Sequence, residues 1–441
     1  MSVAFTKESD HEAEAANLRE MWASCARGGQ LEALEGAAPS WFEFLEARSF
    51  VAEGAAAARL WLAAARAAQA PLSIGRALVH LGLFQRFAGE AAEALVSLDE
   101  AVATLEPLDA APELARAHVA RAFTLFLLGR LDDSEREADV ALVLGESLGS
   151  NPVVAAGCRV KGLVLLQSGR REEGRDLQRR ALEVAVRLGK PSTIASANNN
   201  LALAENHLGN FRAAESGYEN AMSIWRDLNM TVNVGRAMHN LGVVATRMGD
   251  HASALPRYRA ALEVLLKAGE RNLIALNLMS TGDALVRMGR PAEARAPLDQ
   301  SLRMAEHDGH MLPALDSRIV LAQAALALGE RDEAARHLVI ALDGAREHNF
   351  TNVLADAIVA SAHVVATQGP AAERRALSWA ADVARLPATS VAVREDAQAL
   401  LAQSSADFSA VPPRALDELA NEARAALASP TVSRGLAAQA R

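Results

Sequence analysis

The stretch HNLGVVATRMGDHASALPRYRAAL, residues 239–262, decides the fold. A small residue, Gly242, is followed seven residues later by Gly249 and twelve residues after that by a second small residue, Ala261. Apolar residues flank each small residue at helical spacing, and a glycine between two helices can take the left-handed conformation that closes the last turn of the first. The stretch therefore predicts two helices joined by a short turn.

The same pattern returns every 40 residues along most of the chain. The turn glycine stands at Gly89, Gly129, Gly169, Gly209, Gly249, Gly289, Gly329 and Gly369, with small residues seven positions before it and twelve positions after it. A second column of turn residues lies 20 positions away, at Gly149, Gly189, Asn229, Gly269, Gly309 and Asn349. Each unit thus divides into two helices of about 17 residues, and no strand-like alternation competes. We expect an all-α solenoid in which each unit buries its apolar face only on its neighbours.

The residue choices resemble those of the tetratricopeptide repeat. Residues 208–224, LGNFRAAESGYENAMSI, match the second-helix pattern of that family, and residues 239–262 repeat it. The matching positions are Gly209, Phe211, Ala214, Tyr218 and Ala221 in one stretch and Leu241, Gly242, Gly249, Ala254, Tyr258 and Ala261 in the other. The resemblance implies a right-handed superhelix of helix-turn-helix repeats. Both helices should be longer than usual, because the family's period is about 34 residues.

The two ends of the repeat region carry a more specific resemblance. Residues 14–65, from EAANLREMW onward, and residues 385–413, RLPATSVAVREDAQALLAQSSADFSAVPP, look like the entry and the close of the sensor repeats in STAND-class bacterial signal-transduction ATPases, which include maltose-regulon-activator-like regulators. This resemblance covers residues 12–428 and implies that the repeats sense an inducer or a partner. The nucleotide-binding domain of that class is missing from this sequence, so any ATPase is expected to act separately.

The pattern predicts five segments along the chain. We expect a disordered start over residues 1–9, an N-terminal half-repeat helix over 10–28, about nine repeats over 30–390, a helical cap over 391–428 and a flexible tail over 429–441. The cap follows from Pro412 and Pro413, since proline is tolerated in the first turn of a helix.

Composition and charge exclude several classes of protein. Of 441 residues 51% are hydrophobic and only 4% aromatic, so small aliphatic side chains supply the apolar surface. The net charge of −9 argues against a generally basic nucleic-acid binder, although it allows a local basic groove. Cys25 and Cys158 have no paired spacing, and the chain has no signal sequence and no long uncharged apolar stretch. We therefore expect a bacterial cytoplasmic protein without membrane contact.

Three short motifs imitate catalytic or metal sites. GESLG around Ser147 matches a hydrolase nucleophile elbow, LGKPS at 188–192 is similar to part of a phosphate-binding loop, and EHDGH at 306–310 carries possible metal ligands. All three fall in the turns between repeats rather than between a strand and a helix. The sequence therefore predicts no catalytic residues, no metal site and no cofactor.

The resemblance to tetratricopeptide superhelices implies that the first helix of each unit lines a concave groove. Asn200 and Asn240 then occupy one column in adjacent units, and an amide that both donates and accepts can grip a peptide backbone. The alternative is that Asn198, Asn199 and Asn200 satisfy backbone groups between helices or cap a frayed turn. The candidate binding residues are Asn199, Asn200, His207, Arg236, His239, Asn240, Arg247, Asp283 and Arg287 in the middle of the groove, and Phe123, Phe126 and Arg159 in its earlier part.

Charge along this predicted groove is uneven. We count seven arginines there, Arg76, Arg86, Arg116, Arg159, Arg236, Arg247 and Arg287, against the three acids Asp283, Asp316 and Asp356. A basic strip of this kind suits a partner with acidic or phosphorylated side chains. The alternatives are that the arginines pair with neighbouring acids across the hairpins, and that Phe123 and Phe126 pack in the core.

Aromatic residues gather in the N-terminal units of a chain that is otherwise poor in them. Trp22, Trp41 and Trp61 are therefore candidate docking residues at the first edge of the solenoid, with a self-sufficient aromatic cap as the alternative. The leading hypothesis is a non-enzymatic protein that binds a peptide or protein segment in a regulatory or sensing role. The alternatives are a sensor of a small anionic inducer, an adaptor scaffold that acts with a separate ATPase or effector, and an enzyme with an unrecognised site. No direct nucleic-acid partner is expected.

Overall fold

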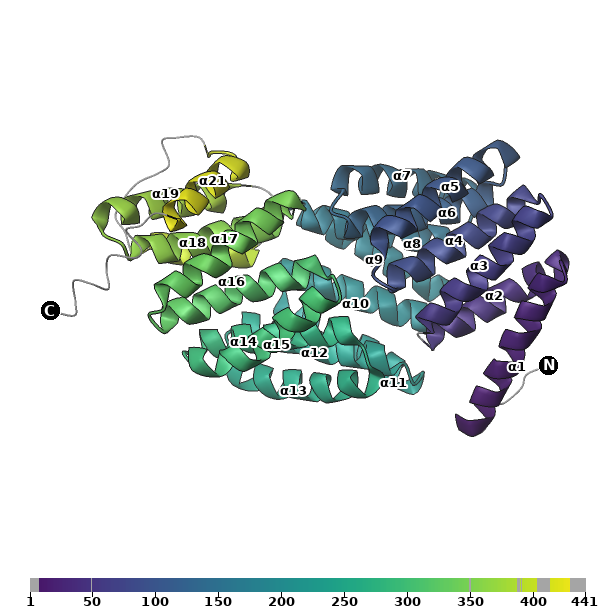
Figure 1. The fold of residues 1–441 in the computed structure, drawn as a ribbon, viewed down its shortest axis with the longest axis horizontal. Coiled ribbons are helices and arrows are strands. Elements are labelled where there is room, and N and C mark those ends of the chain that lie inside the picture. Colours follow the sequence, from purple (N-terminus) through teal and green to yellow (C-terminus); the bar gives the residue numbers. More distant parts are fainter. Residues whose placement is uncertain are drawn as a thin grey trace. The chain divides into compact units, whose positions relative to one another are not determined.

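The structure, a computed structural model, describes residues 8–48, 50–348, 350–386, 389, 391–402 and 413–428. Over these residues the chain forms 21 α-helices and one short 3-10 helix, joined by turns and bends (Figure 1). The prediction of an all-α fold is confirmed. The chain divides into two compact units, unit 1 from Met1 to Val164 and unit 2 from Leu165 to Arg441. The expected disordered start (for residues 1–7) and the expected tail over 429–441 lie outside the described residues.

Unit 1 contains the first seven helices and most of the eighth. They are α1 (Glu8–Arg27), α2 (Leu31–Ala47), α3 (Val51–Ala67), α4 (Pro71–Phe87), α5 (Ala91–Leu105), η1 (Glu106–Leu108), α6 (Ala111–Leu127), α7 (Leu131–Ser147) and α8 (Asn151–Gln167). The expected half-repeat helix is α1, which begins two residues earlier than the predicted 10–28 segment.

Unit 2 contains the remaining helices, which follow the same 40-residue register. They are α9 (Arg171–Leu188), α10 (Pro191–His207), α11 (Phe211–Asp227), α12 (Thr231–Arg247), α13 (His251–Ala268), α14 (Arg271–Arg287), α15 (Pro291–His307), α16 (Met311–Ala327), α17 (Arg331–Glu347), α18 (Thr351–Ala366), α19 (Pro370–Arg385), α20 (Val391–Leu401) and α21 (Leu416–Leu427). None of the described helices is both long and apolar enough to cross a lipid bilayer.

Residues with positive φ separate the helices. Gly249, which ends the turn after α12, has φ 76°, and Asn229 in the second turn column has φ 56°. Gln69 and Asp109 occupy the same column 160 and 120 residues earlier and have φ 51° each. These two turns were missed from the sequence because only glycine and asparagine were sought in this column. Those are the residues that take the left-handed conformation most easily.

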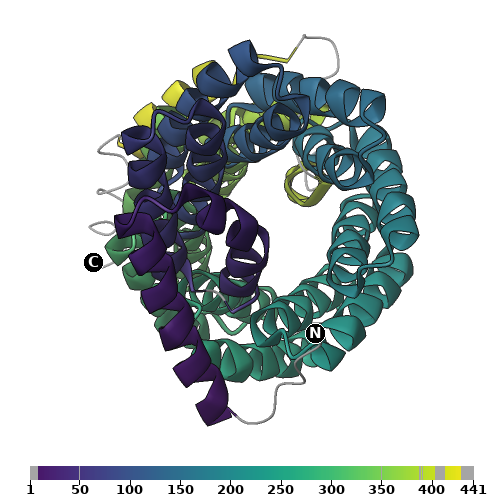
Figure 2. The ribbon, with the colours of Figure 1, turned by 90° about the vertical axis from the view of Figure 1, so that its right-hand side faces the viewer.

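The small-residue columns let paired helices approach closely. A Cβ atom added to Gly242 of α12 would lie 2.6 Å from the Tyr258 ring of α13, and one added to Gly282 of α14 would lie 2.4 Å from Leu298 of α15. First helices of successive pairs also contact one another, as α12, α14, α16 and α18 do in turn. The helices of unit 2 therefore follow a curve, and Figure 2 shows α20 on its inner side.

At each end of the described chain, a terminal helix packs on the neighbouring helices. At the first end, the Trp22 indole of α1 donates a hydrogen bond to the Ala57 carbonyl of α3 at 3.0 Å. At the other end α21 packs on α17 and α18, and the Trp379 indole donates to Glu422 of α21 at 2.8 Å. The predicted cap over 391–428 thus contains two helices with different positions, α20 and α21.

The close approach of paired helices at the glycine positions can be tested by mutation. Gly242→Ala should destabilise the chain by about 1–3 kcal/mol, because the new methyl group overlaps the Tyr258 ring. Gly36→Ala is the matched control: Gly36 is exposed in α2 with no atom near the added Cβ, so alanine there should stabilise by up to about 1 kcal/mol. Thermal unfolding of both variants measures the difference. Equal midpoints would contradict the close approach.

Candidate functional site

The inner face of unit 2 is the layer of first helices α10, α12, α14, α16 and α18, together with α20 at its end. Equivalent residues recur every 40 positions in this layer, so the same column of side chains is presented by neighbouring helices. Most of the residues predicted for the middle of the groove belong to α10, α12 and α14.

Asparagine side chains link the first two helices of this face. The Asn240 amide donates to Oδ1 of Asn199 at 3.1 Å, and the Asn199 amide donates to Oδ1 of Asn200 at 3.3 Å. Asn199 is buried between the helices, and Asn198 donates to the Ile194 carbonyl of its own helix. Asn198 and Asn199 thus satisfy groups within and between helices, as the structural alternative expected.

Asn200 and Asn240 keep hydrogen-bonding capacity. Both are half-buried, and within the described residues Asn200 Nδ2 and Asn240 Oδ1 have no partner. One donor and one acceptor are therefore offered by neighbouring helices. That pair matches the two polar groups that every residue of a peptide backbone presents.

His239 lies elsewhere than the sequence predicted. It is 4% exposed, and its Nδ1 accepts a hydrogen bond from the buried Asn277 amide of α14 at 3.3 Å. Burial lowers its pKa to about 4, so the ring is neutral near pH 7. The expectation of a basic surface residue is corrected: one position along a helix turns the side chain by about 100°, from the face into the helix interface.

The basic part of the inner face lies over α9, α10 and α12. The Arg247 guanidinium donates to the Asn206 carbonyl at 2.5 Å and lies over the Phe211 ring at 5.3 Å. Burial, together with the charges of Arg247 and Arg171, lowers the pKa of His207 to about 4. Burial also lowers the pKa of Arg171, with contributions from Arg394 and Arg247. The positive charge here therefore comes from arginines gathered close together, while His207 is neutral.

Arg171 is a residue that sequence reasoning missed. It opens α9, a second helix of a pair, so its position in the repeat gave no reason to place it at the inner face. Its side chain contacts a residue 218 positions later in the sequence: Nη2 of Arg171 donates a hydrogen bond to the Thr389 carbonyl at 2.6 Å. Arg236 of α12, which was predicted, is exposed by its surface area, yet desolvation by its surroundings lowers its pKa while the charge of Glu270 opposes that shift.

The part of the inner face over α14, α16, α18 and α20 is acidic, which corrects the expectation of a continuous basic strip. Arg287 is bound by Asp283 at 3.0 Å and lies 3.6 Å from Asp396 of α20. Burial raises the pKa of Asp316 to about 7. Burial and the charges of Asp316, Asp396 and Asp283 raise the pKa of Asp356 to about 8. Arg287 is therefore neutralised by its neighbours rather than available to a ligand.

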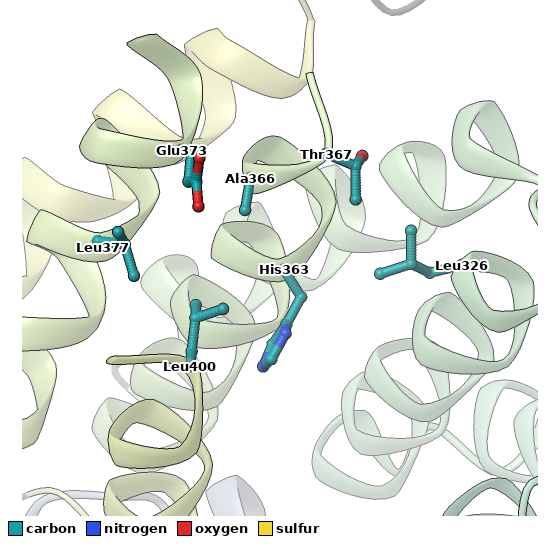
Figure 3. A pocket seen from close by; sticks show the side chains of 7 residues that line it. All are labelled: Leu326, His363, Ala366, Thr367, Glu373, Leu377 and Leu400. Carbon is teal, nitrogen blue, oxygen red and sulfur yellow. The ribbon is translucent and has the colours of Figure 1, made fainter. Parts of the chain in front are cut away.

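A small pocket adjoins this acidic region. Its volume is about 300 Å³, and it lies between α16, α18, α19 and α20 (Figure 3). The lining residues are Leu326, His363, Ala366, Thr367, Glu373, Leu377 and Leu400. Burial lowers the pKa of His363, and within the described residues no hydrogen bond joins it to Glu373. The pocket does not assemble a nucleophile with a base.

The remaining predicted binding residues lie in unit 1. Arg86 and Arg159 both lie over the Phe123 ring, at 4.5 Å and 4.8 Å from its centre, and the ring of Phe126 is 5.9 Å from that of Phe123. Both phenylalanines are half-buried. Arg76 pairs with Glu113 at 2.5 Å, as the ion-pair alternative expected. These residues form a separate cluster from that of unit 2.

The three tryptophans form one aromatic cluster at the start of unit 1. The Trp22 ring lies 6.4 Å from that of Trp41 and 6.2 Å from that of Trp61, and all three are buried. Their neighbours Leu18 and Met21 on α1 are exposed. Because the side chains of Trp22, Trp41 and Trp61 are buried, they are not exposed for docking as predicted, and they fit the alternative, a self-sufficient aromatic cap.

The motifs that imitate catalytic sites are ordinary turns. Ser147 ends α7, and its hydroxyl donates to the Leu144 carbonyl; Gly189 caps α9 with φ 68°. Asp308 is held by Arg271 and His307 at 2.7 Å each. In the described part of the chain, no three His, Cys, Asp or Glu side chains are placed to hold a metal ion, and Cys25 and Cys158 are not joined in a disulfide.

The acidic region predicts a dependence of stability on pH. Asp316 and Asp356 bind protons more tightly in the folded chain than in the unfolded one, so their stabilising contribution is present in acid and is lost as the pH rises through about 7 and about 8. Asp316→Asn combined with Asp356→Asn should therefore raise the unfolding temperature more at about pH 9 than at about pH 5. The exposed Asp227→Asn is the control. A gain of the same size at both pH values would contradict the raised pKa values.

Comparisons with known sequences agree with the repeat pattern. The tetratricopeptide-repeat family model matches residues 193–267 and 233–307. The regulatory protein AfsR of Streptomyces coelicolor is 28% identical over 132 residues. That match covers 30% of this chain and 13% of the length of AfsR.

Solved structures share the arrangement of helices at low identity. A Rap protein complexed with competence and sporulation factor has a TM-score of 0.56 at 15% identity, covering 76% of this chain and 99% of that one. The Rap conjugation gene regulator of the plasmid pLS20, in complex with the Phr* peptide, has a TM-score of 0.55 at 15% identity, covering 77% and 97%. A STAND protein with a tetratricopeptide-repeat sensor from Pyrococcus horikoshii has a TM-score of 0.48 at 15% identity, covering 82% and 54%.

The family match, the 40-residue register and the packing of successive helix pairs lead to one conclusion. The fold is a solenoid of tetratricopeptide-type repeats in which residues 193–307 match the family model, and its helices are arranged like those of Rap proteins.

Proposed function

We propose that the chain is a non-enzymatic regulator that binds an extended peptide or protein segment on the inner face of unit 2. The observation that carries this proposal is the pair of open amide groups, Asn200 Nδ2 and Asn240 Oδ1, on adjacent first helices beside Arg247. The amides bind the backbone of the segment, which makes recognition largely independent of its side chains.

The charges of the inner face then determine which peptide segments bind. Arg171, Arg236 and Arg247 surround the amides with positive charge, so acidic or phosphorylated side chains are favoured over α9, α10 and α12. Over α14, α16 and α18 the face offers no free cation to an acidic group, because Asp283 pairs with Arg287 and the raised pKa values of Asp316 and Asp356 keep those carboxyl groups largely protonated near pH 7. The ligand is therefore an acidic segment whose acidic groups lie toward one end of the face.

The fold supports a regulatory role. The pLS20 Rap regulator, which shares this arrangement of helices, was solved in complex with a peptide, and AfsR, which shares part of the sequence, is a regulatory protein. At these low sequence identities, similarity to the solved structures supports the fold only. The proposed peptide-binding role of this chain therefore rests on the residues of its own inner face. We place the protein in the bacterial cytoplasm, with no nucleic-acid or membrane partner and no cofactor.

Two alternatives use the same residues differently. A small anionic inducer would need only the arginines that gather near His207, and would leave the asparagine amides to water. An adaptor that acts with a separate ATPase or effector would use the exposed side of α1, where Leu18 and Met21 are uncovered, as its docking edge. An enzymatic role has no support in the described side chains, which assemble no nucleophile, base and orienting group.

The amide pair is tested by Asn200→Ala combined with Asn240→Ala. Peptides selected from a random displayed library supply the ligand, and fluorescence anisotropy measures its affinity. The double variant should bind about thirtyfold more weakly, since it loses two hydrogen bonds of about 1 kcal/mol each, while its helical content stays unchanged. Asn220→Ala, on the exposed side of α11, is the control and should bind normally. Normal binding by the double variant would refute the proposed backbone contact.

The electrostatic contribution is tested by Arg236→Glu. This change should weaken binding of an acidic peptide more at low salt than at high salt, because exposed charges are screened over about 10 Å at 0.1 M salt. A neutral peptide of the same length should show a smaller effect. Loss of affinity that is the same at all salt concentrations would mean that the residue acts through structure and not through charge.

A further inference from the structure

The last inner helix brings a fourth arginine to the basic end of the face. α20 begins at Val391, 40 residues after the start of α18, and so extends the series of first helices. It is shorter than the others, and the chain just before it passes close to the start of α9. This is how Arg394 of α20 comes to lie beside Arg171, a residue more than 200 positions earlier.

Two guanidinium groups converge on one carbonyl oxygen at this point. The Thr389 oxygen accepts from Nη2 of Arg171 at 2.6 Å and lies 3.5 Å from Nη2 of Arg394. Arg394 also donates to the Leu386 carbonyl at 3.2 Å. Arg247 is close enough to lower the pKa of Arg171, as Arg394 does. The positive charges of Arg171 and Arg394, from α9 and α20, therefore meet around neutral carbonyl groups, and Arg247 of α12 adds a third charge that acts on Arg171.

Among the residues that the structure describes, little negative charge balances them. Glu395 acts on Arg247 from α20, but its side chain is exposed to solvent. The Nε atoms of Arg171 and Arg394 are buried and have no hydrogen-bond partner within the described structure. Buried donors without acceptors cost free energy, and like charges brought together repel, so the arrangement favours a bound group with several anionic oxygens.

We propose that Arg171, Arg247 and Arg394 form a site for an oxyanion, a phosphate or a carboxylate group, and that the bound anion ties α20 to α9 and α12. The guanidinium fork suits both groups because it offers parallel N–H donors. α20 is anchored on its other side by Val393, Ala397 and Leu400, which are buried in the core of the last helices. The anion thus holds the free side of a helix whose apolar side is already packed.

This inference rests on the proposed function only through Arg247, which both share. The oxyanion comes either from an acidic group of the bound peptide or from a free ion. In both cases binding orders α20, which borders the inner face. Occupancy of the site therefore couples ligand binding to the last helix of the inner layer.

Inorganic phosphate titrated into the full chain at constant ionic strength is the test. Calorimetry should show saturable binding, and hydrogen exchange of the α20 amides should slow as phosphate is added. Arg171→Gln and Arg394→Gln should each weaken phosphate binding about tenfold or more, the size expected for losing a charge-assisted hydrogen bond. Arg374→Gln is the matched control, because Arg374 is exposed on the adjacent α19. Arg394→Lys, which keeps the charge and loses the fork, should bind more weakly than the parent chain and serves if a glutamine variant fails to fold.

Phosphate binding that is no stronger than chloride binding, or that is equal in all variants, would overturn the proposal. So would binding that leaves exchange of the α20 amides unchanged. Competition identifies the source of the oxyanion: phosphate weakens binding of an acidic peptide if the peptide's own carboxylate uses the site, and leaves it unchanged if a free ion does. The Asn200 and Asn240 variant separates the two hypotheses, since it should lose peptide affinity and keep phosphate binding.

Discussion

Close approach of the two helices in each pair is the constraint on which the rest of the structure depends. Gly242 against Tyr258 and Gly282 against Leu298 leave no room for a Cβ atom, so the distance between the paired helices is set by the backbone of one and the side chain of the other. Because the same contact returns every 40 residues, successive pairs stack with the same geometry. First helices then contact first helices, and the inner face of unit 2 follows from that repetition.

Because successive helix pairs stack regularly, residues at the same position in successive repeats form a line of side chains. Asn200 and Asn240 lie on adjacent helices in equivalent positions, and Asn199 joins them through hydrogen bonds. Asp316, Asp356 and Asp396 occupy another such line, where burial raises the pKa values of all three carboxyl groups and the charges of the other two add to the shift of Asp356. The same regularity that stabilises the apolar layer therefore also concentrates charge of one sign, which is unfavourable without a ligand or a counter-ion. Arg287 partly offsets the acidic line, and Thr389 faces the basic group with only a neutral carbonyl.

The position of a residue within the repeat predicted part of this site. For the residues that it misplaced, the structure gives a physical reason in each case. The position in the repeat placed Asn240 and Arg247 on a common helix of the inner layer, because residues seven apart share a face. It misplaced His239, since one further residue along the helix points into the contact with α14. It also treated Arg287 as a free cation, although Asp283 lies one helical turn earlier on the same face and binds it.

The sequence by itself determined the all-α class, the 40-residue register and the helix boundaries to within a few residues, because these depend on local spacing and on turn residues. Only the tertiary structure decided which charges meet. Arg171 and Thr389 are 218 residues apart, and their contact depends on the curvature accumulated over all the intervening helix pairs. A small change in the angle between pairs adds up over that distance, so no local pattern specifies the encounter. The basic end and the place of α20 beside it are products of that accumulated curvature.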